Sequence, residues 1–326
     1  MKNKLAKSNE ASPLLSSRFA KHKKTLVLLT MVAPVAIWLL LIRYIPMGGI
    51  VLAFKDYKIY PKDPTFISNL VHSQWVGWKK FEFLFMTNDA FYMFRNTLGY
   101  NIIFIITGII FPVAFAIMIN ELTKKFVAKA YQTLMFFPYF LSWVVVSYFL
   151  NAFIDAQYGM IPMAQKAAGI ANPMSWYTTP SVWPYIIVVA NLWKNVGYST
   201  VLYLAAITGI DSTQYEAASI DGATKWKQII YVTLPHLKTM ICILFIMNVG
   251  KIFNSDFGLF YNVPMQNGAL FEVTQVIDTF VYRALMVTGD ISMGSAAGLL
   301  QNVLGFICIL TANGIVKKID PDSSMF

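Results

Sequence analysis

Residues of the types that carry out chemistry are few and widely separated in this 326-residue chain. The histidines, His22, His72 and His236, have no ligand spacing around them, whereas a zinc site needs several clustered His, Cys or carboxylate side chains. Cys242 and Cys308 fall inside apolar stretches, where small buried thiols are ordinary packing residues. No G-x-x-x-x-G-K-[ST], G-x-S-x-G or H-E-x-x-H run occurs. The sequence therefore predicts no catalytic residue, no metal and no nucleotide bound by the chain itself.

Polar residues inside apolar stretches are the better candidates for recognising a ligand. In one stretch the spacing places several of them on one helical face, namely Asn191, Lys194, Asn195 and Tyr198. The next stretch holds Asn248, Lys251 and Ser255 on one face, with Asn254 and Asp256 near its outer end. Such groups face the interior of a helix bundle. Nearby aromatic residues are Trp193, Tyr139, Trp143 and Tyr148.

Amides, lysines and aromatic rings together match a sugar, which offers hydroxyl groups and flat C–H faces. The two lysines would also suit an anionic sugar. The alternative is that the polar groups bond to neighbouring helices or a partner subunit, and that the rings pack or form interfacial belts. The sequence leaves both possibilities open.

The composition indicates an integral membrane protein. Hydrophobic residues make up 57% of the chain and charged residues only 13%, well below the quarter expected of a soluble domain. The apolar residues form six stretches long enough to span a bilayer, at about 20 residues each: 25–45, 97–120, 131–152, 182–206, 234–257 and 294–316. The net charge of +10 does not indicate nucleic acid, because the basic residues gather at the ends of these stretches.

The basic residues also predict the orientation. They crowd residues 1–24, the turn between the second and third stretches, and the residues after the sixth, so both termini should face the cytoplasm. The first stretch reads as an uncleaved anchor. Residues 1–24 and 319–326 are predicted tails, and residues 46–96 a folded extracytoplasmic loop. Residues 97–318 form the predicted membrane core.

The stretch "EAASIDGATKWKQIIYVTLP", from Glu216 to Pro235, is unusually polar for a connection between two spans. Asp211, Ser212 and Thr213 are N-cap candidates, and Thr213 and Glu216 have capping-box spacing. Asp221-Gly222 should end a short helix, and Leu234-Pro235 should open the fifth span. Segment 211–233 is therefore predicted to hold a two-turn helix on the cytoplasmic face, offered to a partner or simply connecting two spans.

This segment resembles the EAA signature of ABC-importer permeases, E-A-A-x3-G-x9-I-x-L-P. The matching residues are Glu216, Ala217, Ala218, Gly222, Leu234 and Pro235, and Val232 replaces the usual isoleucine. "NLWKNVGYSTVLYLAAITGIDSTQYEAASIDGA", "TQVIDTFVYRALM" and "GSAAGLLQNVLG" resemble the carbohydrate-uptake, maltose-permease-like branch, over about 95–318. "PMGGIVLAFKDYKI" and "WVGWKKFEFLF" resemble its complex oligosaccharide and polysaccharide subgroup.

The resemblance implies the type I importer permease fold, an all-α membrane protein with six transmembrane helices and a cytoplasmic coupling helix. It also implies partners: a second homologous permease, two cytoplasmic ATPases that carry ATP and Mg, and an extracytoplasmic solute-binding protein. In this family the EAA helix fits a groove on the ATPase. Glu216, Ala217, Ala218 and Gly222 would then couple ATP hydrolysis to a sugar channel in a bacterial cytoplasmic membrane.

Two other classes of function would require different features of the sequence. An ion-coupled secondary transporter would require an intramembrane carboxylate relay, and mid-span Asp or Glu residues are missing from the predicted spans. A non-transporting membrane scaffold would not need the polar stripe from Asn191 to Tyr198.

Overall fold

The computed structural model describes residues 13–60 and 65–319. The predicted tail positions 1–12 and 320–326 lie outside this range. The chain divides into two compact units at Val51/Leu52.

The first unit is a long apolar helix. α1 (Pro13–Leu39) continues through a π-helical turn, η1 (Leu40–Tyr44), into η2 (Ile45–Phe54), whose last residues belong to the second unit. The part apolar enough to cross a membrane runs from Thr25 to Phe54, so the helix continues nine residues past the predicted end of the span at residue 45. The helix also begins within the predicted tail. Its side chains from residue 25 are nearly all exposed and apolar, as expected of a helix in lipid.

Residues 52–60 and 65–87 form a folded connection within the predicted loop 46–96, which is shorter than predicted because α4 begins at Asn88. Strand β1 (Lys55–Asp56) pairs antiparallel with β2 (Gln74–Trp75), with Lys55 opposite Trp75. Helices α2 (Phe66–His72) and α3 (Lys79–Met86) flank the pair. Lys80 bridges Asp56 at 2.9 Å and Asp290 at 3.3 Å, which ties the hairpin to the start of the last long helix.

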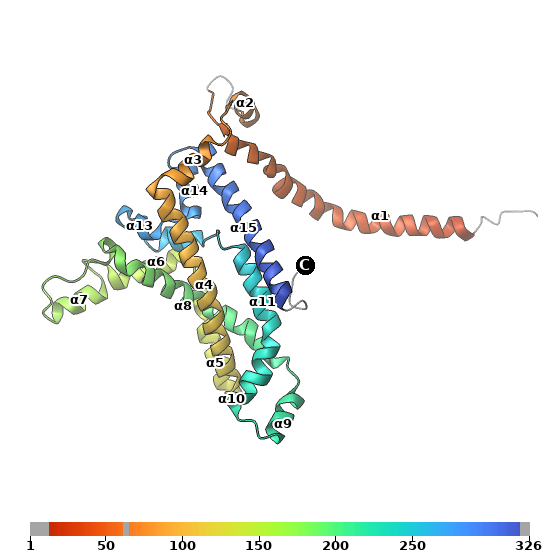
Figure 1. Ribbon diagram of the computed structural model, residues 1–326, viewed down its shortest axis with the longest axis vertical. Coiled ribbons are helices and arrows are strands. Elements are labelled where there is room, and N and C mark those ends of the chain that lie inside the picture. The colour runs from red at the N-terminus through yellow and green to blue at the C-terminus, as the bar shows by residue number, and fades with distance from the viewer. Residues whose placement is uncertain (1–12, 61–64, 320–326) are drawn as a thin grey trace, which may run out of the picture. The chain divides into compact units, whose positions relative to one another are not determined.

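Long helices build most of the second unit (Figure 1). They are α4 (Asn88–Asn120), α5 (Lys125–Phe136) with η3 (Phe137–Phe140), α6 (Trp143–Ile154), α8 (Trp183–Thr208), α11 (Leu234–Gly250) and α15 (Ile291–Ile319). α9 (Ser212–Ile220), α10 (Lys225–Gln228) and the π-helical η6 (Ile229–Thr233) lie between α8 and α11. The expectation of a helical membrane protein is confirmed.

The predicted spans differ from the observed helices in three places. Among the described residues, four continuous helices are long and apolar enough to cross a membrane: 25–54, 88–120, 225–250 and 291–318. The third predicted span is bent by 99° between residues 125–140 and 143–154. Pro138 and the N-cap Ser142 explain this bend, because proline lacks an N–H and Ser142 starts a new helix.

α8 is continuous over 26 residues but is less apolar than these four helices. The polar stripe around Lys194 lowers its average hydropathy. The fifth span, predicted as 234–257, belongs instead to a helix that begins at Lys225 and ends at Gly250.

Two other connections between the long helices are folded. The first is largely exposed, whereas the second has many buried side chains. Residues 155–182 contain α7 (Met160–Ala167), η4 (Trp176–Thr178) and η5 (Pro180–Val182). Residues 251–290 contain α12 (Phe257–Asn262), η7 (Gly268–Leu270), α13 (Phe271–Thr274) and α14 (Ile277–Met286). Leu259, Val263, Leu270 and Val276 are fully buried. This connection is part of the core rather than a surface loop.

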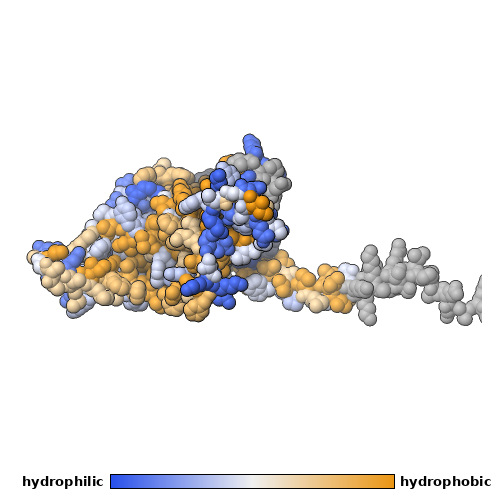
Figure 2. All heavy atoms as spheres, turned by 90° about the horizontal axis from the view of Figure 1, so that it is seen from below, coloured by the Kyte–Doolittle hydropathy of each residue, from blue (hydrophilic) through white to orange (hydrophobic). Residues whose placement is uncertain are grey.

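Three apolar clusters hold the second unit together. One joins α3 and α4 to α14 and α15 around Met93 and Ile277. Another packs α12 and η7 on α4, α6 and α8 around Trp183 and Leu259. The last joins α4, α8 and α11 around Tyr203. Large apolar side chains also cover much of the outer surface (Figure 2), as expected for a membrane protein.

Candidate functional site

The 211–233 segment folds as a short helix followed by the start of a long one. α9 begins at Asp211, whose carboxylate accepts a hydrogen bond from the Thr213 backbone N–H at 3.0 Å. This hydrogen bond lowers the pKa of the Asp211 carboxyl. Asp211 rather than Thr213 is the N-cap, so the predicted capping box from Thr213 to Glu216 is wrong.

The predicted end of this helix is confirmed. Gly222 has a φ of +74°, in the left-handed region that favours glycine. The Ala223 N–H donates to the Ala218 carbonyl at 2.9 Å, which closes the helix end in the manner of a Schellman motif.

One face of α9 docks on the helix that follows it. The Tyr215 hydroxyl lies 3.0 Å from the Thr233 hydroxyl, and Gln228 Nε2 donates to Ser219 Oγ at 2.8 Å. Tyr215 and Ser219 are four residues apart and therefore share a face. Sequence reasoning missed this docking face, although the spacing of the two residues was visible.

The other face of α9 is exposed. Glu216 and Ala217 are exposed and Ala218 is half-buried, while Ile220 presents 86% of its surface. Alanines on an exposed face leave the backbone open to close approach by another molecule. The polar contacts behind this face hold it in a defined position relative to α11.

The helix behind α9 is continuous from Lys225 to Gly250. Leu234 and Pro235 open its regular α-helical part, α11, as predicted, but α10 and η6 precede them in the same continuous helix. The π-helical turn of η6 ends at Thr233, just before Leu234 and Pro235. Proline has no backbone N–H, so the regular α-helical hydrogen bonding is already interrupted at this point. Lys225 pairs with Glu121 at 3.1 Å, which links this helix to the end of α4.

The structure brings together four of the predicted ligand residues, from η3, α6 and α8. Lys194 is 9% exposed, and its ammonium donates to the Tyr139 carbonyl at 2.7 Å. The same ammonium lies 5.3 Å from the ring centre of Tyr139 and 5.4 Å from that of Trp143. Tyr139 and Tyr198 stack with ring centres 4.7 Å apart. Tyr139 and Tyr198 remain 38% and 40% exposed, so the cluster has an accessible aromatic surface beside a cation.

Asp256 completes this cluster from a distant part of the chain. Its carboxylate accepts a hydrogen bond from Trp143 Nε1 at 2.6 Å, and its negative charge attracts the Lys194 ammonium. The sequence placed Asp256 only near the end of a span. We name Tyr139, Trp143, Lys194, Tyr198 and Asp256 the lysine–aromatic cluster.

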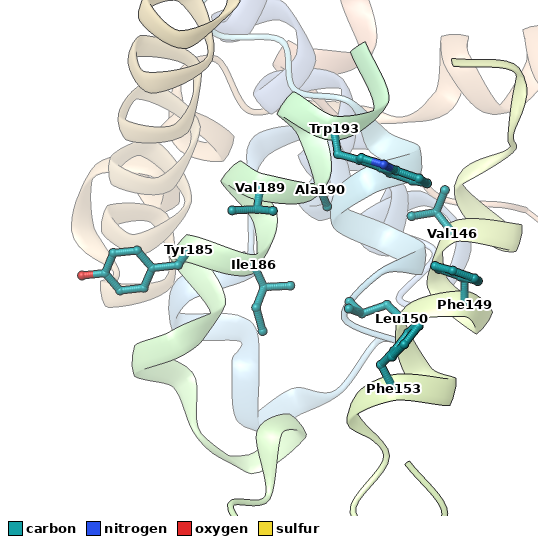
Figure 3. Close-up of a pocket in the computed structure, with 9 residues that line it drawn as sticks. All are labelled: Val146, Phe149, Leu150, Phe153, Tyr185, Ile186, Val189, Ala190 and Trp193. Carbon is teal, nitrogen blue, oxygen red and sulfur yellow. The ribbon is translucent and has the colours of Figure 1, made fainter. Parts of the chain in front are cut away.

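The other predicted ligand residues lie elsewhere. Asn195 Nδ2 donates to the Asn191 carbonyl at 3.1 Å, so these amides interact along α8 itself. Trp193 lines a separate apolar pocket of about 360 Å³ between α6 and α8 (Figure 3). Its indole faces Val146 and Phe149 there. The side chains lining this pocket are apolar or aromatic, so it does not match a sugar.

The predicted face of the fifth span does not exist beyond Gly250. Asn248 is within α11, but Lys251 is its C-cap and Asn254 and Ser255 lie in the turn before α12. Asn101 Nδ2 donates to the Ile252 carbonyl, and Asp278 accepts from the Ser255 N–H at 2.7 Å and from Gln301. Buried polar groups therefore hold this break in the helix.

Among the described residues, no group of three or more His, Cys, Asp or Glu side chains could hold a metal ion. Among the predicted site residues, the exposed face of α9 could bind a partner, and the lysine–aromatic cluster could bind a ligand.

Comparison with known families defines the class of protein. The binding-protein-dependent transport system inner membrane component family matches residues 108–321, and the chain belongs to this family. It is a permease component of an ABC importer, and its helices have the type I importer permease fold. It serves transport rather than catalysis.

The chain is 32% identical to protein LplB of Bacillus subtilis over 307 residues, covering 93% of this chain and 91% of that protein. It is also 32% identical to the polygalacturonan/rhamnogalacturonan transport system permease protein YteP of the same organism, over 88% of this chain and 87% of that one. Among solved structures, a chain of a bacterial ABC transporter involved in import of the acidic polysaccharide alginate matches with a TM-score of 0.82 and 29% identity, covering 93% of this chain and 99% of that chain. A second alginate transporter structure, in complex with an alginate pentasaccharide-bound periplasmic protein, matches with a TM-score of 0.81 and 28% identity over 92% of this chain and 97% of that chain.

Proposed function

We propose that this permease forms half of a channel that imports an acidic oligosaccharide or polysaccharide delivered by a solute-binding protein. The observation that carries the proposal is the lysine–aromatic cluster, which sets a cation among accessible aromatic rings. Such rings suit the C–H faces of a sugar, and an ammonium suits its carboxylate. The names of the relatives support the same class, because polygalacturonan and alginate are both acidic.

The exposed face of α9 is proposed as the contact with a cytoplasmic ATPase. A second permease would complete the channel, and the ATPases would carry ATP and Mg. Both termini of the permease would then face the cytoplasm of a bacterial cell, on the side of α9. A helix end held by the Tyr215–Thr233 and Ser219–Gln228 contacts can act as a small rigid lever between ATPase and channel.

An ion-coupled transporter is the weaker alternative. The half-buried carboxylate of Asp278 is one that the sequence did not predict to lie inside the fold. Its two oxygens accept from Ser255 and Gln301 and so support the break after α11. This arrangement gives Asp278 a structural role and does not form a relay.

The test is uptake by the assembled importer in proteoliposomes, with galacturonate and alginate oligomers as probes and maltooligosaccharides as neutral controls. We expect uptake of an acidic oligomer that requires internal ATP and the binding protein and survives a proton ionophore. Uptake driven by an ion gradient without ATP would contradict the proposal.

In the same assay, Lys194→Ala or Asn191→Ala should lower uptake or change substrate preference while assembly is retained. Lys194→Ala should have the larger effect, because Lys194 contacts the rings whereas Asn191 bonds along its own helix. Wild-type uptake by both variants would exclude the fourth-span site, and loss of assembly would assign these residues a structural role.

A further inference from the structure

A second aromatic cluster lies directly beyond the lysine–aromatic cluster. Phe257 and Tyr261 of α12 stack with ring centres 4.7 Å apart, and Tyr282 of α14 lies 4.9 Å from each of them. All three rings are half-buried, so each keeps accessible surface. We name Phe257, Tyr261 and Tyr282 the outer triad.

The two clusters are joined through the start of α12. Phe257 directly follows Asp256, which accepts the hydrogen bond from Trp143. Gly258 packs so closely on the Trp143 ring that a Cβ at this position would overlap it. The outer triad is therefore fixed beside the lysine–aromatic cluster by direct contact between α12 and α6.

Arg283 follows Tyr282 and supplies a cation next to the outer triad. Its guanidinium carbon lies 4.3 Å from the ring centre of Phe271, and the carboxylate of Asp89 attracts its charge. Within the described residues, its Nη2 atom is buried and has no hydrogen-bond partner. A buried donor without a partner is costly and calls for an explanation. Packing between α12 and α14 accounts for the rings, but it does not account for the unpaired guanidinium nitrogen.

We propose that the outer triad and Arg283 form a second subsite, which takes one acidic sugar residue before it reaches the lysine–aromatic cluster. This inference rests on the proposed function. The rings would stack on the C–H face of the sugar, and the guanidinium would turn to pair with its carboxylate through two parallel N–H···O bonds. The second subsite thus gives the permease a cation at each of two successive aromatic surfaces.

The first experiment measures whether an acidic sugar occupies the subsite. Tyr282→Cys is introduced into the assembled importer in nanodiscs and labelled with a membrane-impermeant maleimide, with and without galacturonate pentamer and its binding protein. Val287→Cys is the control, because Val287 is 73% exposed just past the end of the same helix. We expect the pentamer to slow labelling at position 282 at least about fivefold and to leave position 287 unchanged. Equal protection at both positions, or none at position 282, would overturn the proposal.

The second experiment tests the role of the charge. Arg283→Met keeps an apolar stem against Phe271 but removes the guanidinium, and Arg283→Lys keeps a charge. In the Tyr282→Cys background, Arg283→Met should raise the pentamer concentration needed for half-protection by about tenfold, as expected for one charge-assisted pair. Arg283→Lys should raise it less. An unchanged concentration in Arg283→Met would contradict the assignment of Arg283.

These outcomes are separable from failure of the proposed function. If the wild-type importer takes up acidic oligomers while position 282 is unprotected, only the second subsite is wrong. If it takes up none, the proposed function and the subsite both fail. Co-purification of all subunits with each variant shows whether the importer has assembled. If Arg283→Met does not assemble, Tyr261→Leu replaces it, and unchanged half-protection in Tyr261→Leu would likewise overturn the subsite.

Discussion

At the scale of single residues, Ala217 is the position where a small side chain matters most. It lies on the exposed face of α9, opposite the contacts of Tyr215 and Ser219 with the long helix behind. Replacing it changes nothing inside the permease but adds bulk at the proposed ATPase contact.

We expect Ala217→Trp to uncouple the importer without unfolding it. Overpacking a fitted contact costs about 1–3 kcal/mol. Co-purification of the ATPase and ATP-driven uptake in proteoliposomes should both fall, while the second permease is retained. Ala217→Ser is the matched control, since it changes the same exposed position but adds only one oxygen atom. Wild-type coupling in Ala217→Trp would show that α9 is only a connector.

Lys80 is the second informative residue, because its ammonium pairs with both Asp56 and Asp290. Its hydrogen bond, followed by that of Lys58, holds the pKa of the Asp56 carboxyl below its usual range. A lowered carboxyl pKa stabilises the folded state above the unfolded-state pKa of about 3.9. This contribution is lost as the pH falls through the lower folded-state value.

We therefore expect Lys80→Met to lower the unfolding temperature of the detergent-solubilised protein at pH 6. The difference from wild type should shrink as the pH falls below about 3.9. Lys79→Met, at an exposed neighbouring lysine, should have little effect at either pH. A pH-independent difference for Lys80→Met would mean that the side chain acts through packing alone.

At the scale of elements, the contact between α5 and α8 positions the lysine–aromatic cluster. Gly197 allows this contact, because a Cβ there would overlap the backbone of Met135 and Phe136. The same region places the Tyr139 carbonyl against Lys194. A glycine inside α8 is therefore explained by close packing between backbones.

Gly197→Ala should push α8 away from α5 and destabilise the protein by about 1–3 kcal/mol. Gly108→Ala is the control, because a Cβ at Gly108 of α4 meets nothing within 4 Å and alanine is the better helix former. Thermal unfolding in detergent should rank the variants with Gly197→Ala lowest and Gly108→Ala at or above wild type. Equal stability of the two variants would contradict this account of the α5–α8 contact.

At the scale of the whole molecule, the chain is the permease component of its importer. It has no G-x-x-x-x-G-K-[ST] loop to cradle phosphates. Its described helices present α9 on an exposed face and set cations beside aromatic rings at Lys194 and Arg283.

We expect the purified chain, free of partners, neither to bind nor to hydrolyse ATP. Equilibrium binding of radiolabelled ATP and phosphate release check this, with the assembled importer as the positive control. Stoichiometric ATP binding by the chain alone would contradict the proposal that partner subunits bind the ATP.

The sequence by itself determined the features that depend on residues close together along the chain. The apolar stretches follow from the hydropathy of about 20 consecutive residues. The end of α9 follows from the conformational freedom of Gly222, and the spacing of Asn191, Lys194 and Tyr198 on one helix follows from its period. The family could also be read from Glu216, Ala217, Ala218 and Gly222.

The tertiary structure alone decided which of these residues meet. Lys194 finds its acceptor at Tyr139, 55 residues away, and Trp143 bonds to Asp256, 113 residues away. Helical period cannot encode such pairs, because they depend on how separate helices pack. The same holds for the helix end at Gly250: Asn101 and Asp278 bond to the backbone of the turn that follows, and they come from α4 and α14. Lys251, Asn254 and Ser255 have the spacing of one helical face, so the sequence alone predicts that the helix continues, and only the packed bundle shows where it ends.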